Sequence, residues 1–305
     1  MPLSLDEVFK THEKHKPSLT FIVSEKSPGN ISLNGEGIVQ RYDNNRSDGT
    51  LKYVEIGYMI IEKEKMLKYF ETPNCSFSSI LRKVADCREI CAFVQHDAYH
   101  SISDPVRWKK TEEYLKFKKI ILIDRDGVIN SKALTGQYVG KWDEFEWIED
   151  TVQSMKNLSD NGFSFIVITN QAGIARGMVS EHKMNEMHKL MVSELKNKGI
   201  KIHDIYVCPH HWDDDCLCRK PKAGMLYRAS REWLLRLDQT LFIGDDPRDC
   251  QAAYNAGCKS IYIGDILDVE HLHEKEKPIY SSKKLSECVQ VIMTHYKENI
   301  NYDYN

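Results

Sequence analysis

Lys119-Ile-Ile-Leu-Ile-Asp124-Arg-Asp126-Gly127-Val-Ile-Asn130 is the most informative stretch of this 305-residue chain. Four consecutive apolar residues precede two carboxylates that a single residue separates, and a glycine follows. An unbroken apolar run of this length is typical of a strand covered on both faces, as in a parallel sheet. Ligands of open parallel sheets bind beyond the carboxyl ends of the strands. The stretch therefore predicts a buried strand with Asp124 and Asp126 at a ligand-binding edge.

The composition limits the classes of protein that the chain can belong to. Charged residues make up 29% and hydrophobic residues 41% of a chain long enough for two domains, which is typical of a soluble globular protein. A net charge of -3 argues against nucleic-acid binding. We find neither an apolar run of membrane-spanning length nor a signal peptide. Three of the nine cysteines crowd into residues 208–218, which favours metal binding in a reducing cytoplasm.

Residues 119–305 show strand patterns alternating with helix patterns. After the first strand, we expect strands at 163–168, 205–208, 240–243 and 260–263, and helices at 149–161, 180–198, 223–237, 249–256 and 282–296. This alternation predicts an α/β domain with a doubly wound parallel sheet. Because several strands end in polar residues, one edge of the sheet should collect Asp124, Asp126, Thr169, Asn170, Lys220, Asp245 and Asp246.

The residue types at this edge suit phosphoryl transfer. Carboxylates bind Mg²⁺, which usually completes its shell with water and substrate phosphate. A hydroxyl and an ammonium group suit phosphate oxygens, and they are present as Thr169 and Lys220. A carboxylate can also act as a nucleophile that forms an aspartyl-phosphate. The metal and the lysine would offset the repulsion between that carboxylate and a phosphate dianion.

The order of these motifs, D-x-D-G, then T-N, then lysine, then G-D-D, resembles the haloacid dehalogenase-like phosphatases. The resemblance implies that Asp124 is the nucleophile and Asp126 the general acid/base. It implies that Thr169 and Lys220 bind the phosphoryl group. It also implies that Asp245 holds Mg²⁺ together with Asp124 and the backbone carbonyl of Asp126.

A second cluster precedes Lys220 in the sequence. Three thiols and an imidazole lie within eleven residues, at Cys208, His210, Cys216 and Cys218. Three thiolates and one imidazole suit a tetrahedral structural Zn²⁺, with His211 as the alternative nitrogen ligand. Such a site would brace a long loop and place Arg219 and Lys220 over the active edge.

The zinc loop narrows the resemblance to two families, the D-glycero-D-manno-heptose 1,7-bisphosphate 7-phosphatases and the histidinol-phosphate phosphatases. The runs 169–177 and 218–225 are similar to the heptose family. We therefore expect magnesium-dependent removal of the C7 phosphate through an aspartyl-phosphate, in nucleotide-activated heptose biosynthesis. Substrate would contact Asn170, Gln171, Arg219 and Tyr138. The gaps between motifs have no room for a cap domain. Histidinol-phosphate hydrolysis and a non-catalytic binding or scaffold role are the alternatives, and Asp246 departs from the family pattern.

Residues 1–118 show an α+β pattern that resembles the second half of sugar nucleotidyltransferases. We expect helices at 4–15, 76–85 and 105–116, and strands at 18–23, 37–42, 53–61 and 90–94. Ser101 stands where that family often has a metal-binding aspartate. We expect this region to be inactive alone, as a remnant or docking module of a truncated fusion, and the rest of the chain, 119–305, to be the phosphatase domain. Completion by a separate polypeptide and an unrelated α+β domain are the alternatives.

Overall fold

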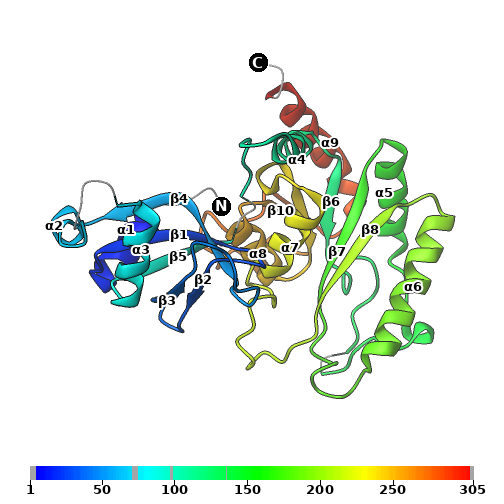
Figure 1. The fold of residues 1–305 in the computed structure, drawn as a ribbon. Coiled ribbons are helices and arrows are strands. Elements are labelled where there is room, and N and C mark those ends of the chain that lie inside the picture. The colour runs from blue at the N-terminus through cyan, green and yellow to red at the C-terminus, as the bar shows by residue number, and fades with distance from the viewer. Residues whose placement is uncertain (1–4, 71–74, 97–98, 135, 303–305) are drawn as a thin grey trace. The chain divides into compact units, whose positions relative to one another are not determined.

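The computed structural model describes residues 5–70, 75–96, 99–134 and 136–302 (Figure 1). The chain divides into two compact units between Tyr99 and His100, rather than at residue 118, where the sequence analysis placed the boundary. The helix α4 (Pro105–Leu115) therefore belongs to the second unit. Contacts within that unit account for the difference. The Nζ of Lys118, just after α4, donates to the main-chain oxygens of Glu113, Trp233 and Leu234.

The second unit is built on a six-stranded sheet in which all neighbouring strands are parallel. Its strands are β6 (Ile120–Ile123), β7 (Ser164–Asn170), β8 (Ile202–Cys208), β9 (Leu241–Gly244), β10 (Lys259–Ile263) and β11 (Tyr280–Ser282). They lie in the order β11-β10-β9-β6-β7-β8. The chain winds away from β6 on one side and from β9 on the other. The switch point of this doubly wound sheet, where ligands bind in such folds, lies between β6 and β9.

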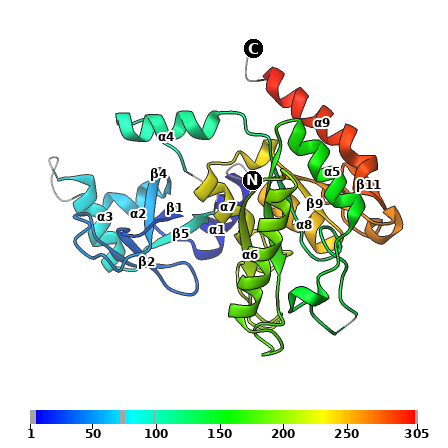
Figure 2. The same cartoon turned by 90° about the vertical axis from the view of Figure 1, so that its right-hand side faces the viewer.

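Helices cover both faces of this sheet. They are α5 (Glu149–Asp160), α6 (Glu181–Asn197), α7 (Gly224–Trp233), α8 (Pro247–Ala256) and α9 (Leu285–Tyr302). Side chains of a strand alternate between faces, so Ile121 and Ile123 pack with α5, α6 and α9, whereas Ile120 and Leu122 pack with α7 and α8. Figure 2 shows α5, α6 and α9 toward the viewer. Burial on both faces explains why β6 is apolar at every position, as the sequence predicted.

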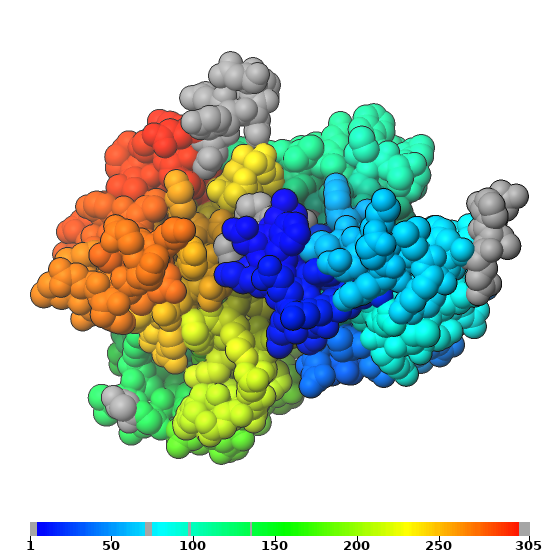
Figure 3. Space-filling model, turned by 90° about the vertical axis from the view of Figure 1, so that its left-hand side faces the viewer, coloured from blue at the N-terminus to red at the C-terminus, as the bar shows by residue number. Residues whose placement is uncertain are grey.

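The first unit has a mixed five-stranded sheet in the order β3-β2-β4-β1-β5. Its strands are β1 (Leu19–Glu25), β2 (Ile31–Leu33), β3 (Val39–Tyr42), β4 (Tyr53–Ile61) and β5 (Ile90–Gln95). Its helices are α1 (Leu5–His15), α2 (Lys63–Leu67) and α3 (Phe77–Asp86). Phe21 and Val23 of β1 pack against α3, while Ile22 between them packs against Val8 of α1, drawn in dark blue in Figure 3.

The expected helices and strands are present within a few residues at their ends. The elements that the sequence did not predict are short: β2, α2, β11 and the 3₁₀ turns Trp142–Glu144, Leu237–Gln239 and Ile266–Val269. Three to five residues are too few for a periodic pattern. Residue 4, where we expected the first helix to begin, lies outside the described residues. Within the described residues, no helix has the length and apolar character that crossing a membrane requires.

Candidate active site

Asp124 after β6, Lys220 from the loop after β8 and Asp249 of α8 meet in the interior of the second unit. The Nζ of Lys220 lies 2.9 Å from Oδ2 of Asp124 and 2.7 Å from Oδ1 of Asp249. It also donates to the main-chain oxygen of Ile168 at 3.1 Å. Lys220 is 3% exposed. Its two carboxylate partners raise the pKa of the ammonium group against the effect of burial, so Lys220 carries its charge into the site.

Three carboxylates converge at this edge in a way that suits a divalent cation. Oxygen atoms of Asp124, Asp245 and Asp249 lie within 4.8 Å of one another. Burial, with the nearby carboxylates adding to it, raises the pKa of Asp124 to about 7. Burial likewise raises the pKa of Asp245 to about 6, although Lys132 lies 2.5 Å away and acts in the opposite direction. One oxygen of Asp245 is buried without a hydrogen-bond partner. A bound Mg²⁺ would relieve both the repulsion and the missing contact.

Gly127 permits the close approach of the loop after β6 to the end of β9. Its backbone has φ +87°, and a Cβ at this position would lie 1.9 Å from Oδ2 of Asp245. A larger residue would therefore displace a carboxylate that faces the cation site. Glycine is thus required after D-x-D for two reasons: the positive φ, and the lack of space for a Cβ.

Asp126 lines the same cavity, and three neighbours fix its carboxylate. Arg125 donates to both of its oxygens, Asn130 Nδ2 donates to Oδ1 at 2.9 Å, and Gln171 Nε2 donates to Oδ2 at 2.7 Å. Burial alone would raise the pKa of Asp126, but the Arg125 charge and these hydrogen bonds outweigh burial and lower it. The cavity also holds Thr169, whose hydroxyl accepts a hydrogen bond from Gln171 Nε2 at 2.8 Å.

The other residues expected to contact substrate lie around two adjoining cavities. Asn170 lines both cavities. Its Oδ1 accepts from the main-chain N–H of Lys220 at 3.1 Å, and its Nδ2 donates to the main-chain oxygen of Lys220 at 3.2 Å. Gln171 faces Asp126 instead and is 1% exposed. Tyr138 and Arg219 line the second cavity, of about 360 Å³, which opens beside Asp126. A Cβ on Gly173 would lie 2.7 Å from the Tyr138 ring, so the glycine lets this loop close over the run after β7.

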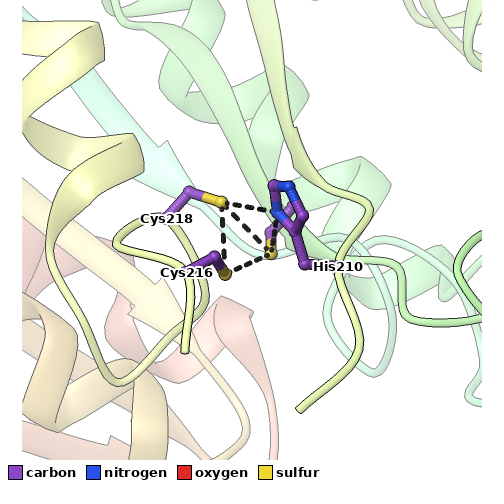
Figure 4. A group of neighbouring side chains, drawn as sticks. His210, Cys216 and Cys218 are labelled. Carbon is purple, nitrogen blue, oxygen red and sulfur yellow. Dashed lines mark hydrogen bonds between the residues drawn. The ribbon is translucent and has the colours of Figure 1, made fainter. Parts of the chain in front are cut away.

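The donor atoms of the four residues expected to bind zinc all lie within 4.8 Å of one another. Figure 4 shows three of them, His210, Cys216 and Cys218, pointing toward one another. The three sulfur–sulfur distances are 3.4, 3.5 and 3.7 Å, and Nδ1 of His210 lies 3.7 Å from Cys208 Sγ and 3.1 Å from Cys218 Sγ. A tetrahedron with typical zinc bond lengths has edges of about 3.6 to 3.8 Å. The donor set therefore fits Zn²⁺. His211 points elsewhere, because its Nδ1 pairs with Asp213 at 3.2 Å.

Three residues near the cavities were not predicted from the sequence: Asp249, Lys132 and Arg248. Asp249 has a local signal, since it stands four residues after Asp245 in the first turn of α8, but this position also suits the capping box that it forms with Asp246. Lys132 and Arg248 reach the cavities from a loop and a helix start. Asp246, which departs from the family pattern by its negative charge, caps α8. It pairs with Arg248 at 2.7 Å, and this ion pair offsets the charge.

A doubly wound sheet with D-x-D after β6, a threonine near the carboxyl end of β7, a buried lysine and an aspartate after β9 defines a phosphatase of the haloacid dehalogenase-like class. Residues 119–277 match the protein family described as polynucleotide kinase 3 phosphatase. A relative from Photorhabdus laumondii, named D-glycero-alpha-D-manno-heptose-1,7-bisphosphate 7-phosphatase, is 36% identical over 152 residues, which span 48% of this chain and 81% of the relative. By these two matches, the chain belongs to the family of the heptose bisphosphate phosphatases.

Further relatives and a solved structure agree with this placement. A protein of the same name from Campylobacter jejuni is 39% identical over 138 residues, 45% of this chain and 77% of the relative. One from Pasteurella multocida, named for the beta anomer, is 35% identical over 149 residues, 47% of this chain and 79% of the relative. The D,D-heptose 1,7-bisphosphate phosphatase from B. bronchiseptica, complexed with magnesium and phosphate, superposes with a TM-score of 0.53 at 30% identity, covering 58% of this chain and 98% of that one.

Proposed function

We propose that the second unit is a magnesium-dependent phosphatase that removes the C7 phosphate of D-glycero-D-manno-heptose 1,7-bisphosphate through an aspartyl-phosphate. The observation that supports this proposal most strongly is the ion pair of Asp124 with the buried Lys220, 2.9 Å apart at the switch point of the sheet. Membership of the heptose phosphatase family supports the substrate class.

In the first half of the proposed reaction, the carboxylate of Asp124 attacks phosphorus and the bond to the sugar oxygen breaks. Lys220 and Thr169 hold the phosphoryl oxygens, and Asp126 gives the leaving oxygen its proton. Arg125 favours the carboxylate form of Asp126 in the free site. An entering phosphate dianion acts in the opposite direction, since a like charge raises the pKa of a carboxyl group. Substrate binding would thus favour protonation of Asp126, and this proton is the one that the leaving group needs.

In the second half, Asp126 takes a proton from water, and the resulting hydroxide attacks the aspartyl-phosphate and frees Asp124. The hydrogen bonds from Asn130 and Gln171 favour the carboxylate form, which this step requires as its base. Asp124, Asp245 and the backbone carbonyl of Asp126 would hold Mg²⁺, which would supply positive charge that stabilises the transferring phosphoryl group. Zn²⁺ on the Cys₃His cluster has a structural role in this proposal.

The charges around the second cavity support a bisphosphate over histidinol phosphate. Lys132, Arg219 and Arg248 line the cavity beside Asp126, and one nitrogen of Arg219, Nη1, is buried without a hydrogen-bond partner. Three cations suit a second phosphate and repel a cationic amine. The acidic run 213–215 could attract that amine. However, none of its three residues is among the described residues that line this cavity. Asp215 pairs with Lys222 instead.

We expect the specificity constant for heptose 1,7-bisphosphate to exceed that for histidinol phosphate by about tenfold or more, since unpaired polar groups penalise a substrate that lacks the matching ones. Phosphate release from both substrates, measured side by side, tests this expectation. An equal or reversed preference would assign the chain to histidinol-phosphate hydrolysis. Release from neither substrate would favour a binding or scaffold role.

Arg219→Ala should reduce this preference more than it reduces hydrolysis of a simple aryl phosphate, because only the sugar bisphosphate can use the lost guanidinium. Lys222→Ala is the matched control, since Lys222 is a basic residue of the same loop whose side chain turns to Asp215. If both variants changed the preference equally, Arg219 would have no specific part in it.

We also propose that the first unit does not transfer nucleotides by itself. Among the described residues, clusters able to hold a metal occur in the second unit and not in the first. The purified chain, given nucleoside triphosphates and heptose 1-phosphate with Mg²⁺, should form no nucleotide sugar. Formation of such a product would contradict the proposal.

A further inference from the structure

Arg125 stands between the two reactive carboxylates and is the largest fully buried side chain of the described residues. Its Nε donates to Oδ1 of Asp126 at 3.1 Å, and its Nη2 lies 2.7 Å from both carboxylate oxygens. A guanidinium group keeps its charge inside a protein, so each of its donors needs a partner there. The remaining donors, on Nη1, point away from the cavity toward α6.

The far end of the guanidinium is held by α6. Nη1 of Arg125 lies 2.9 Å from Nε2 of His188 and 2.9 Å from Sδ of Met184. These two residues are four positions apart and therefore share one face of the helix. Both are buried. Burial, with the Arg125 charge second, lowers the pKa of His188 to about 3, so the ring is neutral and Nε2 accepts the hydrogen bond.

We propose that His188 is a positioning residue for the general acid/base: it anchors Arg125, and Arg125 aims the carboxylate of Asp126 into the cavity. Of the residues that the structure describes, Arg125 alone bonds both oxygens of that carboxylate, while Asn130 and Gln171 bond one each. The inference rests on the proposed function, because it needs Asp126 to move a proton.

Loss of His188 acts on the reaction through this chain of contacts. An apolar replacement leaves a cationic N–H of Arg125 buried and unpaired, which favours a tilt of the guanidinium toward other acceptors. Asp126 would move with it. A displacement of about 1 Å at a reacting group can cost about a hundredfold in rate.

The choice of substrate separates this role from general damage to the fold. When Asp124 bonds to phosphorus, the bond from phosphorus to the sugar oxygen breaks, and that oxygen takes the proton of Asp126. With p-nitrophenyl phosphate the same bonds form and break, but nitrophenolate leaves as an anion and needs no proton. The kcat/KM value covers the steps up to release of the leaving group. A misplaced Asp126 therefore lowers kcat/KM for the sugar phosphate and spares it for the aryl phosphate.

The test uses the full chain with Mg²⁺ and both substrates. We expect His188→Leu to lower kcat/KM for heptose 1,7-bisphosphate about tenfold or more, and for p-nitrophenyl phosphate by less than about threefold. His188→Gln should stay within about threefold of the wild type for both, because its amide oxygen can accept from Arg125. His182→Leu, on the exposed side of the same helix, is the matched control and should change neither value.

An equal loss on both substrates, or no loss on either, would overturn the proposal. So would a His188→Gln variant as impaired as His188→Leu. If His188→Leu does not fold, His188→Asn takes its place, because its amide is too short to reach Arg125, and the same dependence on substrate is expected. A wild-type chain inactive on both substrates would overturn the proposed function itself, whereas an active wild type with substrate-independent losses overturns only the role of His188.

Discussion

Asp124→Asn should abolish phosphate release from every phosphomonoester that the wild type hydrolyses, while the chain stays folded. The substitution keeps the shape of the side chain but removes the charge that attacks phosphorus in the proposed reaction. Loss of a nucleophile that acts in concert with its neighbours costs far more than about a hundredfold in kcat. Phosphate release under saturating substrate and Mg²⁺ measures the effect. A variant that keeps more than about a hundredth of the wild-type rate would show that Asp124 is not the nucleophile.

Stability needs a separate check, because Asp124 is buried beside Lys220. After the substitution, Lys220 still has Asp249 at 2.7 Å, so its charge does not become unpaired. Removal of one of three crowded carboxylates also relieves repulsion at the site. We therefore expect a melting temperature close to that of the wild type. Asp160→Asn is the matched control, since this exposed aspartate of α5 pairs with Lys156 at the surface and should leave the rate unchanged.

Much of the site could be predicted from the sequence because its signals are local. A four-residue apolar run such as β6 can bury both faces only inside a sheet, and polar residues directly after such strands must meet at one edge. The same holds for the zinc loop, in which all four donors lie within eleven residues. Choosing His210 over His211 depended on a C-x-H pattern, and the structure brings His210 into the cluster.

The contacts that the sequence did not reveal join residues far apart in the chain. His188 of α6 bonds Arg125, which lies 63 positions earlier in the chain. The pattern of this helix accounts for a buried residue at position 188 but not for its partner. Lys132 meets Asp245 from a loop without periodicity. Each of these residues also has an ordinary structural interpretation, as a buried core side chain or a loop lysine. Only the folded arrangement distinguishes the two interpretations.

We expect the protein purified without added metal to carry about one Zn²⁺ per chain, bound by three sulfurs and one nitrogen. The physical reason is the convergence of Cys208, His210, Cys216 and Cys218, whose donor atoms already lie close to the edges of a zinc-sized tetrahedron. Elemental analysis gives the stoichiometry, and X-ray absorption at the zinc edge gives the ligand types. Absence of tightly held metal together with full activity would contradict a structural zinc site.

Cys218→Ser should remove this metal and most of the activity together, because Lys220 follows two residues after Cys218 and must reach Asp124 from the same loop. Without the metal, conformational entropy favours a disordered loop, and a misplacement of about 1 Å at Lys220 can cost about a hundredfold in rate. Cys87→Ser, at an exposed cysteine of the first unit, is the matched control and should keep both zinc and activity. A Cys218→Ser chain that lost zinc yet hydrolysed substrate at the wild-type rate would show that the loop holds Lys220 in place without the metal.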